Sequence, residues 1–386
     1  MDKLTGFKFA GIHCGVKKEK KDLGIILCED GANCVGVFTK NRFASPTISE
    51  SKRILKSNKI NAVVVNSGNA NCLTGQKGHE NIKALIDKAT ATFQLEKDST
   101  LSLSTGIIGV QLPIEKIVNG IEILKENVSD SITNYAQAIL TTDLIQKQSE
   151  RTILIDGQEV NILGVAKGSG MIQPNMATML AFIMTDATID KKLLQKSLNN
   201  AVNTSFNAIT VDSDSSTNDT CLLLASNKGA IINEKNCGEF NKAVKEVAID
   251  LAKLIIKDAE GATKFVTVNI NNATNEIEAK NIFYAISNSP LVKTAIFGEN
   301  PNFGRILCSA GKINSNIDPD KTDLYLGEHL LYTNGAVTEQ NKSELDSYMK
   351  HYEIEITLDL NIGDAGFTGW TSDLSHAYVD INAEYN

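Results

Sequence analysis

The chain has 386 residues, of which 42% are hydrophobic and 22% are charged, and its formal net charge is −8. These values are ordinary for a globular protein, and the length predicts two or three packed layers or two domains rather than one small core. A nucleic-acid-binding protein usually has a basic face that neutralises phosphates, so the negative charge argues against that class of function.

The predicted elements alternate between strands and helices. In chain order they are a strand at 61–66, helices at 82–93 and 114–124, a strand at 220–226, a helix at 240–255, and strands at 263–271 and 353–360. The helices have apolar residues at helical spacing. The first two strands are continuous apolar runs, which indicates burial on both faces, and the last two alternate. This mixture predicts a layered α/β (α+β) fold with mixed sheets, but no linker or repeat marks a domain boundary.

Two kinds of sequence meet in the segment Ala166–Ala187. Glycines at 168 and 170 and Pro174 oppose regular structure in its first half. Residues 179–184 are continuously apolar and are expected to be buried. Thr178 stands at the junction, where its hydroxyl would be shielded from water. Taken alone, the pattern also fits a tight turn that leads into a core strand.

The same segment resembles the ornithine acetyltransferase family, the bifunctional glutamate N-acetyltransferases of arginine biosynthesis. Its signature, KGSGM-x-x-PNMATMLAF followed by TDA, is matched from Lys167 to Ala187. The resemblance extends over essentially the whole chain. Further matches are NSGNANCLTG at 66–75, STGIIG around Thr105, TTD at 141–143, ITVDSDSSTNDT at 209–220, DAEGATK at 258–264, NPNFGRIL at 300–307 and INAEY from Ile381. The resemblance implies a self-cleaving fold of the N-terminal-nucleophile type.

The resemblance implies that the precursor cuts itself between Ala177 and Thr178. The products would be an α chain, 1–177, and a β chain, 178–386, which the family suggests assemble as an α2β2 heterotetramer. Threonine is a poor nucleophile unless a base takes its proton. As a new N-terminus, Thr178 would carry that base itself, since a free α-amino group has a pKa of about 7.7–8.0.

The resemblance also implies the reaction and the residues that perform it. Thr178 would take the acetyl group from N-acetylornithine as an ester and pass it to glutamate in a ping-pong sequence. The Thr105 hydroxyl and the Gly106 N–H would form the oxyanion hole that stabilises both tetrahedral intermediates. Without the family match, Thr105-Gly106 reads simply as a strand that ends in a turn.

The remaining site residues follow from the same match. Lys167 would meet the substrate carboxylate, and Glu260, placed at the end of a helix over 240–259, would meet the substrate amine. A Glu at that end is disfavoured by the helix dipole, which favours a functional reason for it. Asn382 and one of Thr141 and Thr142 would complete the substrate shell. The sequence does not decide between the two threonines.

Some features leave the interpretation open. The sequence does not show whether acetyl-CoA is a second acetyl donor. It departs from the family at Gln173, Ser213 and Phe303, where members often carry His, Gly and Trp. Members also carry a further hydroxyl residue after the position of Asn386, which contributes to the substrate site.

Two other functions compete with acetyl transfer. An N-terminal-nucleophile amidohydrolase or aminopeptidase would share Thr178 and the oxyanion hole but give the acyl group to water. It would not need the Lys167/Glu260 pair that suits a free amino acid. A metabolite-binding protein that has lost the chemistry would remain an uncut precursor.

The chain shows no sign of a cofactor, metal or membrane partner. Asp212 and Asp214 begin a calcium-like loop, but Thr217 stands where the loop needs Gly and Leu223 where it needs Glu. No phosphate-binding glycine motif occurs, and the seven cysteines and five histidines form neither a C-x-x-C nor an H-x-x-x-H pair. With no apolar run of roughly 20 residues and no presequence, a cytoplasmic protein is expected.

Overall fold

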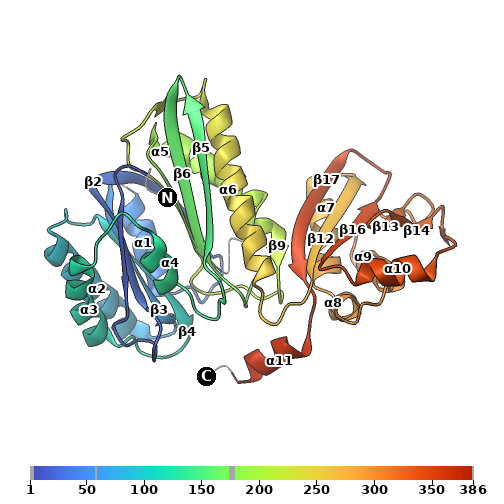
Figure 1. Cartoon of the computed structure of the whole chain (residues 1–386), viewed down its shortest axis with the longest axis horizontal. Coiled ribbons are helices and arrows are strands. Elements are labelled where there is room, and N and C mark those ends of the chain that lie inside the picture. Colours follow the sequence, from blue (N-terminus) through green and yellow to red (C-terminus); the bar gives the residue numbers. More distant parts are fainter. Residues whose placement is uncertain (1–3, 57–58, 174–178, 385–386) are drawn as a thin grey trace. The chain divides into compact units, whose positions relative to one another are not determined.

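The computed structural model describes residues 4–56, 59–173 and 179–384 (Figure 1). The chain divides into two compact units. Unit 1 comprises residues 1–207 and 214–255, and unit 2 comprises residues 208–213 and 256–386. Each unit combines a sheet with helices, so the α/β class expected from the sequence is confirmed. The division itself was not marked by composition.

Unit 1 is built on a sheet with the order β4-β3-β2-β10-β7-β6-β5, in which β1 also pairs with β2. Its strands are β1 (Lys8–Ile12), β2 (Leu23–Phe38), β3 (Ile60–Asn69), β4 (Thr100–Ile107), β5 (Lys147–Ile155), β6 (Gln158–Lys167), β7 (Leu180–Thr185) and β10 (Thr220–Ala225), with a separate pair β8 (Thr188–Ile189) and β11 (Ile231–Ile232). The long strand β2 serves two halves of the sheet. Residues 23–27 pair with β1 and β3, whereas residues 33–38 pair with β10.

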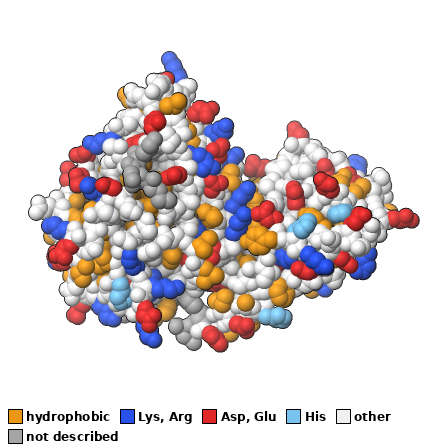
Figure 2. All heavy atoms as spheres, in the orientation of Figure 1, with side chains coloured by type: hydrophobic (Ala, Val, Ile, Leu, Met, Phe, Trp, Pro, Cys, Tyr) orange, Lys and Arg blue, Asp and Glu red, His pale blue; other side chains and the backbone are white. Residues whose placement is uncertain are grey.

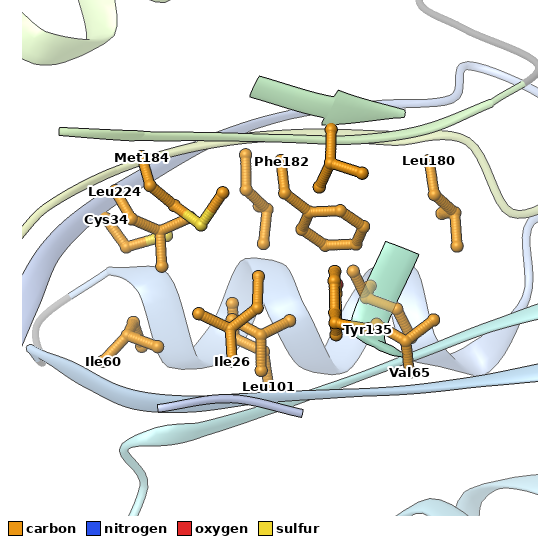
Figure 3. Packing of buried hydrophobic residues seen from close by; sticks show 14 of the residues in the cluster. Ile26, Cys34, Ile60, Val65, Leu101, Tyr135, Leu180, Phe182, Met184 and Leu224 are labelled. Atoms are coloured by element: carbon orange, nitrogen blue, oxygen red, sulfur yellow. The ribbon is translucent and has the colours of Figure 1, made fainter. Parts of the chain in front are cut away.

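An apolar core fills the space between these two halves (Figure 3). Alternate residues of β7, namely Leu180, Phe182 and Met184, point into it and face Val65 and Leu101 from the other half. The opposite face of β7 is buried too, since all its residues are buried. The predicted burial of residues 179–184 is therefore confirmed.

The helices that begin in this unit are α1 (Pro46–Leu55), α2 (Gly75–Phe93), α3 (Ile114–Glu126), α4 (Thr133–Ala138), α5 (Lys191–Asn203), the short 3-10 helix η1 (Phe206–Ala208) and α6 (Cys237–Lys257). Helices α1 and α4 contribute Ile48 and Tyr135 to the core between the two halves. Helices α2 and α3 pack through Leu85 and Ile121 against the face of β3 that carries Val64. Helix α6 lies on β6 at Gly164, where a side chain would clash with Val247. All three predicted helices lie within α2, α3 and α6.

Unit 2 has a sheet of its own with the order β15-β14-β13-β16-β12-β17-β9. Its strands are β9 (Ile209–Thr210), β12 (Phe265–Ala273), β13 (Asp323–Leu326), β14 (His329–Thr333), β15 (Ala336–Val337), β16 (Glu353–Asp359) and β17 (Ala365–Ser372). Its helices are α7 (Glu276–Ser287), α8 (Pro290–Phe297), α9 (Phe303–Gly311), α10 (Lys342–Met349) and α11 (His376–Ala383). The two alternating segments of the sequence form β12 and β16, whose side chains alternate in burial as predicted.

The surface of the chain mixes both signs of charge. Acidic and basic side chains are interspersed on the face that Figure 2 shows. Within the described ranges, no helix combines the length and the apolar character that crossing a bilayer would require.

Candidate active site

The candidate site of unit 1 lies where β6 ends and β7 begins. Lys167, the last residue of β6, is paired with Leu180, the first residue of β7. The Gly-rich connection between them therefore leaves and rejoins the sheet at neighbouring positions. Ala177 and Thr178, the expected cleavage site and nucleophile, lie outside the described residues. Met179, the residue bonded to Thr178, is buried, and its carbonyl accepts a hydrogen bond from the Thr220 N–H at 3.0 Å.

Three of the predicted residues meet at this end of the sheet. The Lys167 Nζ donates to the Thr105 Oγ1 at 3.1 Å and to the Thr141 Oγ1 at 3.2 Å. Lys167 and Thr105 are both buried. Because the Thr105 oxygen accepts this bond, its own proton points elsewhere, and the nearby ammonium makes the hydroxyl a stronger donor. Of the two candidate threonines, Thr141 is the one that accepts a hydrogen bond from Lys167, which favours it as the second substrate hydroxyl.

Gly106 follows Thr105 in a conformation that suits only glycine. Its φ is +132°, and a Cβ at this position would lie 2.3 Å from the carbonyl carbon of Gly68. The register between β3 and β4 shifts at Gly68 and Asn69, so the chain departs here from a regular parallel ladder. Irregularities of this kind re-aim the backbone beside active sites.

A buried ion pair, which no sequence pattern marked for a role, lies next to these residues. Asp143 and Lys147 have fully buried side chains with the Lys147 Nζ 2.6 Å from the Asp143 Oδ1. Asp143 also accepts hydrogen bonds from the N–H groups of Gly168 at 2.7 Å and Thr141 at 3.0 Å. Burial raises the pKa of Asp143, but the ammonium groups of Lys147 and Lys167 outweigh it, and the pKa falls to about 2. The TTD match at 141–143 was the one available signal for Asp143.

Lys17 is a further cation that the sequence gave no reason to select. Its Nζ donates to the carbonyl of Leu140 at 2.7 Å, one residue before Thr141. Its backbone N–H donates at 2.8 Å to the carboxylate of Asp22, which is fully buried. Burial lowers the pKa of Lys17 to about 8, against the opposing effect of Asp22. Three ammonium groups (17, 147 and 167) and two carboxylates (22 and 143) thus line this region, with one positive charge in excess among the five.

The other two predicted residues meet in unit 2. The Asn382 Nδ2 donates to the Glu260 Oε2 at 2.9 Å and to the carbonyl of Tyr378 at 3.0 Å. The predicted helix over 240–259 is too long, because α6 ends at Lys257. The chain then turns through Gly261, which has a φ of +67°. Glu260 therefore lies in this turn, beyond the helix terminus.

The described residues contain no group of three or more His, Cys, Asp and Glu side chains that could hold a metal ion. The unit 1 cluster instead offers an ammonium group and two hydroxyls, with Gly106 next to Thr105 in the chain. Such groups bind a carboxylate and donate to an oxygen that becomes negatively charged, as in acyl transfer.

Comparison with known proteins gives consistent matches. The ArgJ family model matches residues 8–386. The arginine biosynthesis bifunctional protein ArgJ of Caldanaerobacter subterraneus subsp. tengcongensis is 43% identical over 98% of this chain and 96% of that protein. The ArgJ protein of Chlorobaculum tepidum is 42% identical over 98% of this chain and 95% of its own length. A solved chain of the ArgJ protein of Bacillus halodurans is 37% identical, with a TM-score of 0.52, and covers 54% of this chain and 100% of the solved chain.

Proposed function

The chain belongs to the ArgJ family, and from this premise we propose that it transfers an acetyl group from N-acetylornithine to glutamate. It is an acetyltransferase of arginine biosynthesis that acts on small molecules. The observation that carries the proposed reaction is the buried Lys167 ammonium, which binds the hydroxyls of Thr105 and Thr141 beside Gly106. A reaction with a negatively charged intermediate uses this arrangement, whereas a binding protein does not need it.

In the proposed mechanism Thr178 is the nucleophile. Its α-amino group takes the hydroxyl proton as the oxygen attacks the acetyl carbonyl of N-acetylornithine. The carbon–nitrogen bond then breaks, the proton moves to the leaving amine, and the acetyl group remains as an ester. The amine of glutamate attacks this ester, the ester bond breaks, and the threonine oxygen regains a proton. The Thr105 hydroxyl and the Gly106 N–H donate to the oxyanion of both steps.

Self-cleavage between Ala177 and Thr178 is part of this proposal. One supporting observation is the pairing of Lys167 with Leu180, which brings the two ends of the Gly-rich connection to neighbouring positions in the sheet. A second is the length of the solved Bacillus halodurans chain, which in full covers 54% of this chain. The 209 residues from 178 to 386 are also 54% of 386.

We propose that the excess positive charge around Lys167 binds the substrate carboxylate. Glu260, which Asn382 holds by a hydrogen bond, would bind the substrate amine. Glu260→Gln should then raise KM for N-acetylornithine with little change in kcat. Glu344→Gln is the matched control, since Glu344 also accepts a hydrogen bond from an asparagine Nδ2, at 2.8 Å. An unchanged KM in Glu260→Gln would remove Glu260 from the substrate site.

Two α and two β chains form the proposed assembly.

Product analysis tests the proposed function against hydrolysis. The purified protein is incubated with N-acetylornithine, with and without glutamate, and ornithine, acetate and N-acetylglutamate are quantified. Transfer predicts one N-acetylglutamate for each ornithine, with acetate suppressed by glutamate. Acetate equal to ornithine at every glutamate concentration would instead identify an amidohydrolase. Replacing N-acetylornithine by acetyl-CoA shows whether the enzyme accepts a second donor.

A further inference from the structure

The segment Asp214–Asn218 lies between the strand that carries the oxyanion hole and the loop that leads to the cleavage site. It precedes β10, which pairs with β7 on one side and β2 on the other. The sequence of this polar segment is part of the family match at 209–220 and resembles a calcium loop, but neither pattern gives it a role. Its hydrogen bonds within unit 1 indicate a different role.

Asn218 holds β4, the strand that carries Thr105. Its side chain is buried, and its Nδ2 donates to the carbonyl of Ser104 at 2.9 Å and to the carbonyl of Ala70 at 2.6 Å. Thr217 fixes the amide orientation by donating from Oγ1 to the Asn218 Oδ1 at 2.7 Å. Ser104 directly precedes Thr105, so Asn218 fixes the peptide that leads into the proposed oxyanion hole.

Asn66 holds the side chain of Ser104 from the β3 side. Its Oδ1 accepts a hydrogen bond from the Ser104 Oγ at 2.6 Å, and its Nδ2 donates to the Asn69 carbonyl at 2.8 Å. The strand needs this support because β4 is the last strand of the sheet and its ladder with β3 is irregular at Gly68 and Asn69. The Asn66 amide thus binds the Asn69 carbonyl at the point where the register shifts, and its oxygen binds Ser104 just before that point.

The same segment holds the loop before the cleavage site. The Gln173 N–H donates to the carbonyl of Asp214 at 2.8 Å. The Ser215 Oγ donates to the carbonyl of Gln173, also at 2.8 Å. Both polar groups of the Gln173 backbone are therefore bound to residues 214–215. The segment Asp214–Asn218 is therefore hydrogen-bonded both to β4, which carries Thr105, and to the loop before the cleavage site.

We propose that Asp214–Asn218 is a positioning element that aligns the cleavage loop with the oxyanion donors. The inference rests on the proposed function, because it assigns the element a part in self-cleavage and in acetyl transfer. Asn218 and Ser215 are positioning residues, since they act through Ser104 and Gln173. A displacement of about 1 Å in a reacting geometry can lower a rate roughly 100-fold. A small shift of the Ser104 peptide would therefore be sufficient to lower the rate of acetyl transfer.

Asn218→Ala tests the oxyanion side. We expect kcat per mole of cleaved enzyme to fall about 10- to 100-fold, with KM for both substrates within about twofold of wild type, because the oxyanion forms in both half-reactions. Asn61→Ala is the matched control. Asn61 is also buried and its Nδ2 also binds two carbonyls, those of Cys28 at 3.1 Å and Glu29 at 2.9 Å, but it lies at the opposite end of β3. Should Asn218→Ala fail to fold, Thr217→Val removes only the hydroxyl that orients the Asn218 amide and should lower kcat in the same direction.

Ser215→Ala tests the cleavage side. Protein made by cell-free synthesis is followed by denaturing electrophoresis, and we expect the half-time of self-cleavage to lengthen about fivefold, the effect of one ordinary hydrogen bond. The kcat of the cleaved variant should match wild type. Ser49→Ala is the control, since the Ser49 Oγ donates to the carbonyl of Pro46 at 2.9 Å on an exposed helix end.

The inference is overturned if Asn218→Ala loses no more kcat than Asn61→Ala, or if Ser215→Ala cuts itself as fast as Ser49→Ala. The cleavage assay needs no acetyl substrate. A wild-type protein that cleaves itself but transfers no acetyl group would therefore reject the proposed function, while Ser215→Ala would still decide the inference.

Discussion

The role proposed for Thr105 depends on one hydrogen bond. Lys167 donates to the oxygen of Thr105 at 3.1 Å, so the hydroxyl proton is directed to another acceptor. We expect Thr105→Ala to lower kcat about 100-fold or more without a comparable change in KM, because the oxyanion exists only near the transition state. Thr105→Ser keeps the hydroxyl and should retain most of the activity. Initial rates at saturating and limiting substrate measure both constants, and an unchanged kcat in the alanine variant would exclude Thr105 from the oxyanion hole.

The Asp143–Lys147 pair should contribute measurably to stability. Both side chains are fully buried, so Asp143→Asn leaves a buried ammonium without its carboxylate, at a cost of about 3–5 kcal/mol in the free energy of unfolding. Glu80→Gln breaks the exposed pair with Lys77 in the same unit and should cost less than about 1 kcal/mol. Urea denaturation measures both.

The Asp143–Lys147 pair should also change how the stability of the protein depends on pH. The pKa of Asp143 is lowered from 3.8 to about 2 in the folded chain. The stability that its carboxylate contributes is therefore complete above the unfolded value and is lost as the pH falls from about 4 to about 2. Asp143→Asn should lack that part of the acid-induced loss. A variant as stable as wild type, with the same acid profile, would contradict the assignment.

At the scale of elements, the irregular end of β4 should depend on glycine. A Cβ on Gly106 would lie 2.3 Å from the carbonyl carbon of Gly68, and its φ is +132°. Gly106→Ala should therefore displace the strand end and abolish most of the activity. Gly109→Ala is the matched control, because its φ is +84° but no atom lies within 4 Å of the added Cβ. It should cost only about 1–2 kcal/mol of backbone strain, with activity retained. Equal activity in both variants would show that the geometry at Gly106 is not needed.

The elements themselves were largely predictable because their patterns are local. Helical spacing located α2, α3 and α6, and continuous or alternating apolar runs located β3, β10, β12 and β16. The end of α6 was placed too late, because the turn at Gly261 interrupts a sequence that still has helix-forming residues. The double use of β2 was not predictable, since which strands pair with it depends on contacts far along the chain.

The site was predictable only where a family motif supplied the residues. Lys167 and Thr105 were selected in this way, and the structure brings them together across 62 positions of sequence. The Asp143–Lys147 pair, Lys17 and Asn218 were not assigned a role. Their significance comes from burial and from partners in other elements, such as the Asn218 bond to Ser104, which no spacing rule reveals.

At the scale of the whole molecule, the proposed cleavage does not coincide with the division into units. Unit 1 contains residues from both sides of the Ala177–Thr178 bond. Strand β7, which would begin the β chain, lies between β6 of the α chain and β10, and β10 pairs with β2 of the α chain. We therefore expect the cleaved chains to co-elute in size-exclusion chromatography and to separate only in denaturant. Separation under native conditions would contradict either the cleavage position or this sheet order.

The most direct test of the account is an intact-mass spectrum of the purified protein under denaturing conditions, recorded after brief exposure to N-acetylornithine without glutamate. The account predicts two species, residues 1–177 and 178–386, with one acetyl group added to the second species on the peptide that begins with Thr178. Later addition of glutamate should remove that acetyl group as N-acetylglutamate. An uncut chain that still transfers acetyl groups, or a cut chain that transfers them with Thr178 never modified, would contradict the central role assigned to Thr178.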